Sequence, residues 1–301
     1  MTYAQPGIFA QGTRSHHYLE LDLRPGVLLP EIRAALGALR EPQVTAGGLN
    51  LVIGFGATAL GRLAPDAVPV QLAPFQPVEG VGGAVPSAQR DVWIWLHGTG
   101  PDVVLDGARL AAATLAPVAQ LVRQQPAFVY RDSRDMTGFI DGTENPTVEE
   151  APGVALVPDG DVGAGGSYVI AMRWVHDLGA FSALPVPEQE AVFGRTKDLS
   201  IDLGESKPPT AHIRRVVIEE DGEELEIYRR STPFGDVASQ GLYFTAFSAE
   251  PSRFTKMLAA MFGATGDGLH DRLTEFSRPD GAGLYFAPSL QVLAGICRAT
   301  A

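Results

Sequence analysis

The sequence of 301 residues is poor in cysteine and lysine and contains no long apolar run. Its one cysteine, Cys297, cannot form an internal disulfide, and no histidine or cysteine spacing typical of a zinc or iron–sulfur site accompanies it. We therefore expect Cys297 to be a partly buried apolar residue. The most apolar stretch, residues 110–122, contains Pro117 and Gln120 and is shorter than the ~20 residues that a membrane-spanning helix needs.

Positive charge is scarce as well, because 23 Lys and Arg face 35 Asp and Glu, for a formal net charge of -12. An acidic surface repels phosphate backbones, which argues against nucleic acid as a partner. Residues 1–18 show neither a basic segment followed by an apolar one nor a twin-arginine pair, so we expect no export signal and a cytoplasmic protein.

The first half of the chain alternates between strand and helix patterns. Period-two alternation or short apolar runs predict strands at residues 18–23, 49–55, 92–96 and 127–130. Apolar residues three and four apart predict a helix at 32–39, and a second is expected at 106–124, with Asp106 as its N-cap and a break at Pro117.

Two features add detail to this half. The strand at 92–96 would place Trp93 and Trp95 on one face and its aliphatic residues on the other. Residues 64–90 are rich in proline and glycine and predict a long loop, of the kind that is functional or wraps another element.

The second half repeats the plan. Strands are predicted at residues 168–175, 213–218, 225–229 and 241–247, and helices at 187–193 and 254–261. The pair Asp221-Gly222 predicts a hairpin turn between two of these strands. Two such halves indicate two stacked α+β units, with a boundary near residues 133–165 and helices over one face of each antiparallel sheet.

Residues 137–146, at this junction, read as an ordinary turn because they contain Asp-Gly and Asn-Pro pairs. Phe139 and Ile140 point to more, since apolar neighbours draw the carboxylate of Asp141 into an interior that raises its pKa unless it is paired. Such a carboxylate can accept and return a proton near neutral pH. Likewise His212, taken alone, fits a surface or core histidine as well as a ligand.

Several segments in order resemble the dye-decolorising (DyP-type) haem peroxidases, in particular their bacterial cytoplasmic branch. GFIDGTENP at residues 138–146 contains the family's GxxDG signature, and AHIRR at 211–215 and IYRRSTPFG at 227–235 follow it, as do GLYFTAF and LYFAPSL. The similarity runs from about Leu21 to Leu293.

The resemblance implies two tandem ferredoxin-like units in a dimeric α+β barrel-like arrangement, with antiparallel sheets and helices packed outside. We divide the chain into residues 1–135 and a haem-binding unit, 136–301. One haem b per chain would reduce hydrogen peroxide and oxidise dyes or other aromatic donors in one-electron steps. The family also implies a homo-oligomer, and we expect no C-terminal extension of the kind that docks some members in a protein shell.

The resemblance also assigns roles to residues. His212 matches the axial ligand of the haem iron, and Asp271 falls where a carboxylate would hold the other ring nitrogen of that histidine. Asp141 and Arg229 match the pair above the haem, with Ser231 beside them, and would move the peroxide proton and stabilise the developing charge. The remaining expected cofactor contacts are Arg195, Gly142, Thr143 and Phe247. Arg195 would face a haem propionate, although a solvated arginine at a helix end is the other interpretation.

One tension arises from the hairpin. A two-residue turn at Asp221-Gly222 would pair His212 with Ser231 and place His212 and Arg229 on the same face, whereas the two must lie on opposite faces of the haem. We therefore predict that His212 lies just before the regular strand, in the loop after Pro208-Pro209.

Three alternatives stay open. The same pocket would serve a haem-handling or iron-releasing protein in which peroxidase activity is incidental. The fold would also serve a haem-free α+β barrel that binds a small molecule. A hydrolase using Asp141 and Glu144 is the weakest alternative, because their spacing in a flexible loop fixes no carboxylate separation. For donors too large to enter the pocket, Trp174 and Tyr243 are candidate electron relays, although packing explains both.

Overall fold

The computed structural model describes residues 2–39 and 48–298. The helices and strands of the first half are β1 (Ser15–Leu23), α1 (Leu29–Ala38), β2 (Leu49–Phe55), α2 (Ala57–Leu63), β3 (Val78–Gly80), β4 (Gly83–Val85), β5 (Val92–Gly98), α3 (Pro101–Leu115) and β6 (Ala119–Phe128). Short 3-10 helices lie at Pro6–Ile8 and Pro65–Ala67.

The helices and strands of the second half are α4 (Ala151–Ala155), β7 (Ser167–His176), α5 (Leu178–Ala183), α6 (Val186–Phe193), α7 (His212–Val216), β8 (Glu219–Glu220), β9 (Glu223–Glu224), β10 (Tyr228–Arg229), β11 (Thr232–Gly235), β12 (Gln240–Ser248), α8 (Ser252–Phe262), β13 (Ser277–Ala287) and α9 (Leu290–Ile296). Short 3-10 helices lie at Gly204–Ser206 and Arg272–Glu275. None of the described helices is both long and apolar enough to span a bilayer.

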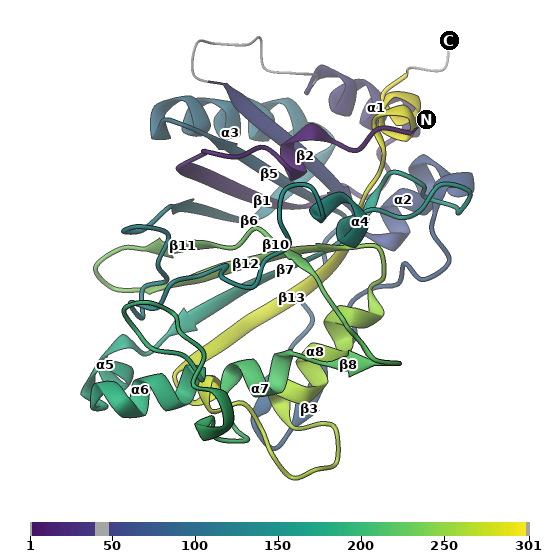
Figure 1. Cartoon of the computed structure of the whole chain (residues 1–301). Coiled ribbons are helices and arrows are strands. Elements are labelled where there is room, and N and C mark those ends of the chain that lie inside the picture. Colours follow the sequence, from purple (N-terminus) through teal and green to yellow (C-terminus); the bar gives the residue numbers. More distant parts are fainter. Residues whose placement is uncertain (1, 40–47, 299–301) are drawn as a thin grey trace.

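The strands form one antiparallel sheet in the order β10-β12-β7-β13-β2-β5-β1-β6, with β11 paired to β12. The two halves join where Phe286 of β13 pairs with Phe55 of β2. The sheet curls until β11 lies against β6, while α1, α2 and α3 cover its upper part and α5 to α8 its lower part (Figure 1). This is the expected α+β plan of antiparallel sheets with helices outside; the division at residues 135 and 136 stays a prediction.

Side-chain alternation along the strands separates two cores. Val92, Ile94 and Leu96 face the helices of the first half, whereas Trp93 and Trp95 face inward, as predicted. The inward layer is aromatic and lies between the two halves of the sheet, where the rings of Tyr18 and Tyr243 stack with centroids 3.9 Å apart. The curled sheet therefore has an aromatic interior, whereas its outer faces pack both aliphatic and aromatic side chains against the helices.

The helix predicted at residues 106–124 is wrong at both ends. Helix α3 begins at Pro101 after Gly100 and ends at Leu115, and Asp106 is an exposed residue within it, paired with Arg109. Pro117 stops the helix because it has no N–H to donate to a carbonyl of the preceding turn. The chain then reverses, and residues 119–128 form strand β6 instead of the end of a helix.

The strand predicted at 213–218 is also wrong, because His212 begins the short helix α7. The turn itself is as predicted: Asp221 and Gly222 both have positive φ, and Glu219 pairs with Glu224. The hairpin, however, is only two residues long on each side. His212 therefore lies outside the pairing, as the expected placement of the haem requires, but in a helix and not in a loop.

The long loop predicted at 64–90 contains the β3–β4 hairpin and crosses to the second half. The N–H of Gly82 donates to the carbonyl of Phe262 at 3.0 Å, and Ala282 in β13 donates to Pro86 at 2.9 Å. The loop thus wraps another element, which the sequence left as one of two options.

Close packing of β12 against β7 yields a stability prediction. A Cβ at Gly241 would overlap the carbonyl oxygen of Trp174 on the neighbouring strand, whereas a Cβ at Gly61, in α2, meets nothing within 4 Å. Gly241→Ala should lower the free energy of unfolding by about 1–3 kcal/mol. Gly61→Ala should leave it unchanged or raise it by up to about 1 kcal/mol. Urea unfolding of both variants checks this, and equal midpoints would contradict it.

Two buried histidines in the aromatic interior predict acid sensitivity. Burial, with smaller effects of His16 and Arg230, lowers the pKa of His97 to about 2, and burial and Arg230 lower the pKa of His16 to about 4. Below ~6.5 the unfolded chain binds protons that the folded chain does not, so stability falls as pH drops. Urea unfolding between about pH 6.5 and 4 should show a loss of up to about 1.4 kcal/mol per pH unit for each histidine.

The matched variant is His97→Gln, since an amide can donate to the Gly7 carbonyl and accept from Thr13 as the imidazole does at 3.0 Å on each side. Its stability should fall less steeply with decreasing pH. An unchanged slope would show that His97 does not contribute.

Candidate active site

A cavity lies between the second-half sheet and helices α6, α7 and α8. The empty space between its walls, including the part open to solvent, is about 1490 Å³. Its walls are largely apolar, because alternation in β7 and β12 turns one set of side chains toward the helices: Ile170, Met172, Trp174, Leu242 and Phe244. Four side chains of α8 face them: Phe254, Met257, Leu258 and Met261.

His212 enters this cavity from α7. Its Nδ1 lies 2.6 Å from Oδ2 of Asp271, which is fully buried and accepts a second bond from the Leu273 N–H at 2.8 Å. Because Nδ1 is engaged, the lone pair of Nε2 is the one free to bind a metal. The contact between Asp271 and His212 that the sequence suggested is therefore present.

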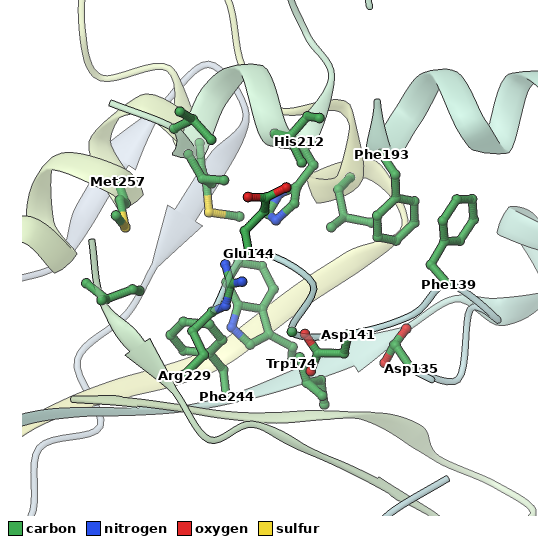
Figure 2. Close-up of a pocket in the computed structure, with 18 of the residues that line it drawn as sticks. Asp135, Phe139, Asp141, Glu144, Trp174, Phe193, His212, Arg229, Phe244 and Met257 are labelled. Carbon is green, nitrogen blue, oxygen red and sulfur yellow. The ribbon is translucent and has the colours of Figure 1, made fainter. Parts of the chain in front are cut away.

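Asp141 and Arg229 lie on the opposite side of the cavity, facing the His212 ring (Figure 2). Burial raises the pKa of Asp141, Arg229 counteracts this, and Asp135 adds to it; the net shift is upward, as predicted. The Nε of Arg229 is buried and has no hydrogen-bond partner among the described residues. A buried donor without a partner is costly, so this geometry leaves the guanidinium of Arg229 and the carboxyl group of Asp141 ready to meet a bound molecule.

Asn145 joins the loop of Asp141 to the strand of Arg229. Nothing in the sequence except its place in GFIDGTENP pointed to this role of Asn145. Its side chain accepts from the Arg229 N–H at 2.8 Å and donates to the Arg229 carbonyl at 3.0 Å. The loop that carries Asp141 is thereby fixed to β10, which carries Arg229.

Of the other residues expected to contact the cofactor, some line the cavity and some do not. Gly142, Thr143 and Arg195 line the cavity. Arg195 pairs with Glu144 and donates to the Ser200 carbonyl at 2.8 Å, so it is not a solvated helix-end residue. Burial lowers its pKa.

Ser231 lies outside this cavity but lines an adjacent one, which shares Asp141 and Arg229 with the first. The acid–guanidinium pair therefore separates two cavities. Phe247 is a correction: it lies on the opposite face of β12, where it packs against Trp93 and Trp95 and cannot contact a ligand in the cavity.

Of the two candidate electron-relay residues, one lines the cavity and the other does not. Trp174 lines the cavity. Tyr243 is buried on the other face of the sheet and donates to Glu20 at 2.8 Å. The sequence analysis also missed three polar residues on the cavity wall, Asp135, His176 and Ser277.

The residues present fit a haem. An apolar cavity of this size accommodates a macrocycle, the free imidazole nitrogen can ligate iron, and the unpartnered Arg229 lies on the side opposite the ligand.

Comparison with known proteins gives a consistent result. Sequence models described as Dyp-type peroxidase, N-terminal, and Dyp-type peroxidase, C-terminal, match residues 5–128 and 132–292. The chain is 37% identical over 257 residues to a dye-decolorizing peroxidase of Rhodococcus erythropolis, covering 83% of this chain and 75% of that protein. It is 36% identical over 250 residues to one of Brevibacterium linens, covering 81% and 68%.

Solved structures agree. A DypB variant of Rhodococcus jostii RHA1 in complex with heme superposes with a TM-score of 0.89 at 31% identity, covering 94% of this chain and 96% of that one. A dye-decolorizing protein from V. cholerae gives a TM-score of 0.88 at 35% identity, covering 97% and 99%.

Proposed function

Because the chain belongs to the family of Dyp-type, dye-decolorising peroxidases, we propose that His212, Asp141 and Arg229 form its active site. The protein is a haem b-dependent peroxidase that reduces hydrogen peroxide and oxidises dyes or other aromatic donors. A haem-handling role with incidental peroxidase activity is not favoured. A cytoplasmic location and a homo-oligomeric state stay predictions.

The observation that carries the proposal is the opposition of two polar pairs across an apolar cavity. His212 and Asp271 lie on one side, and Asp141 and Arg229 on the other. His212 would bind the iron through Nε2, the apolar walls would enclose the ring, and Arg195 would meet a carboxylate at its edge. When bound, the haem supplies the redox chemistry, taking two oxidising equivalents from peroxide and passing them to donors one at a time.

Asp271 would act through His212. Its carboxylate accepts from Nδ1, which fixes the ring orientation and increases the negative character of the imidazole. An electron-rich ligand favours oxidised iron.

Asp141 would accept the proton that peroxide loses and return it to the departing oxygen. This work requires an ionised carboxylate, and the raised pKa of Asp141 brings its ionisation closer to neutral pH. The rate of the peroxide reaction should therefore fall as pH drops through that pKa. The unpartnered Nε of the Arg229 guanidinium would stabilise the negative charge that develops on oxygen.

The role of His212 is tested by its replacement. His212→Ala should lose haem during gel filtration and change the Soret band, because the iron then loses its proposed ligand, Nε2 of His212. His17→Ala is the control, since His17 is part of β1 and its side chain bonds Gln124 of β6 at 2.9 Å, away from the cavity. An unaltered spectrum and full haem retention in His212→Ala would remove this residue from the site.

The role of Arg229 is tested by Arg229→Leu, which keeps bulk and removes charge. Stopped-flow mixing with peroxide should show the first spectral change slowed on the order of 10²-fold or more, as for loss of other groups that stabilise developing charge. Arg109→Leu, on the exposed face of α3, should react at the parent rate. A parent rate in Arg229→Leu would contradict the assignment.

A further inference from the structure

A hydrogen-bonded chain of three side chains on the cavity wall has no part in the roles assigned so far. His176 ends strand β7, and its Nε2 lies 3.1 Å from Oδ1 of Asp135, while its Nδ1 lies 2.7 Å from Oγ of Ser277. Thr137 completes the shell of Asp135 by donating to Oδ2 from its N–H at 2.9 Å and its hydroxyl at 2.6 Å. Asp135 is thus a buried carboxylate with a histidine and two further donors bonded to it.

One tight loop connects Asp135, at the end of this hydrogen-bonded chain, to Asp141. The N–H of Asp135 donates to the Phe139 carbonyl at 2.8 Å, and the N–H of Asp141 donates to the Ser133 carbonyl at 3.0 Å, which closes the loop on itself. Both carboxylates line the same apolar cavity. Two negative charges in such a space oppose each other unless a cation offsets one of them.

The shifts in pKa follow this arrangement. Burial raises the pKa of Asp141, Arg229 opposes that effect, and the neighbouring Asp135 raises it further. Burial alone would also raise the pKa of Asp135, but His176 and the bonds from Thr137 outweigh it and lower that pKa. His176 therefore keeps Asp135 ionised, and Asp135 in turn acts on Asp141.

We propose that His176 is a positioning residue for the peroxide reaction: through its bond to Asp135 it offsets the charge of that carboxylate and so allows Asp141 to ionise in the same cavity. This inference rests on the proposed role of Asp141. Ser277 fixes the ring, because its Oγ lies 2.7 Å from Nδ1 and this contact turns Nε2 toward Asp135.

The other charged groups around the loop are engaged elsewhere. Arg134 donates to the carbonyls of Gly138, Lys197 and Asp198. Lys197 bonds Gln189 through its ammonium group, and Asp177 accepts from the Ala180 N–H at the start of α5.

Charged groups from other elements also act on Asp141. Arg229 of β10 and His212 of α7 both lower its pKa, and neither is bonded to Asp135 among the described contacts. Of the described residues, His176 is the titratable base in a hydrogen bond with Asp135.

The three hydrogen-bonded side chains Ser277, His176 and Asp135 have the composition of a Ser–His–Asp triad, but their arrangement does not indicate hydrolysis. In a triad the serine bonds Nε2 and the aspartate bonds Nδ1, whereas here the two nitrogens are exchanged, and Ser277 is buried at the start of β13. A purely mechanical clamp between loop and strand is the competing explanation, and the test separates it from a charge effect.

The test uses two variants that keep size and hydrogen bonding but change charge in opposite ways. His176→Gln removes the compensating group, so the pKa of Asp141 should rise. Asp135→Asn removes the opposing negative charge, so the pKa of Asp141 should fall. On the acid limb of the pH–rate profile for peroxide, His176→Gln should be slower and Asp135→Asn faster than the parent, each on the order of tenfold for a shift of about one pH unit.

The second measurement does not depend on turnover. The pKa of Asp141 is read from pH-difference infrared spectra of the haem-loaded chain, with its carboxyl band identified by loss in Asp141→Asn. The double variant Asp135→Asn/His176→Gln should resemble Asp135→Asn alone, because no charge is left to offset, and it carries the test if His176→Gln does not fold. Movement of both single variants in the same direction, or no movement of the Asp141 band in either, would overturn the inference.

The two proposals fail separately. If Asp141→Asn reacts with peroxide at the parent rate, the proposed role of Asp141 is wrong, whatever the infrared titrations give. If Asp141→Asn is slow but His176→Gln leaves the Asp141 band where it was, only the role of His176 is wrong.

Discussion

Strands β7 and β12 carry two different surfaces, and the alternation of side chains along a strand is the constraint that makes this possible. One set of residues, including Trp174 and Phe244, faces the helices and walls the cavity. The other set, including Tyr243 and Phe247, packs into the aromatic interior against the first half of the sheet. The cavity wall is therefore supported from behind by large rigid rings, which keep it fixed.

Charge inside an apolar space is the second theme of this molecule. Several ionisable groups of the cavity have a defined partner: Asp271 holds His212, Asn145 fixes the backbone of Arg229, and His176 holds Asp135. The Nε of Arg229 has none among the described residues, and it lies on the side of the cavity opposite His212. Reactive groups are left under-satisfied where chemistry occurs and satisfied elsewhere.

Sequence patterns predicted much of this fold, because a strand with one buried face has apolar residues at every second position. The faces of Trp93 and Trp95 and the ends of α8 followed directly. The break expected at Pro117 is present. The errors have physical causes: Asp106 has the residue type of an N-cap but lies within α3, and a short helix at His212 is indistinguishable from a strand in so few residues.

The site was predictable only in part. His212, Asp141 and Arg229 came from a family resemblance, and their grouping follows from tertiary contacts that no local pattern encodes. Phe247 was misplaced although parity with Phe244, three positions earlier, puts it on the other face of β12. The bond between Asp135 and His176 joins a loop to the end of a strand 41 residues away, and local sequence carries no signal for such a pair.

The loop at 64–90 couples the two halves. It leaves the first half, bonds to the end of α8 and to β13, and returns as β5, so part of the support behind the cavity is made by residues far from it in sequence. Separating the halves would strip backbone hydrogen bonds from β13 and expose the aromatic layer at once. The cofactor-binding half therefore depends on the first half for part of its backbone hydrogen bonding and for the cover over its aromatic layer.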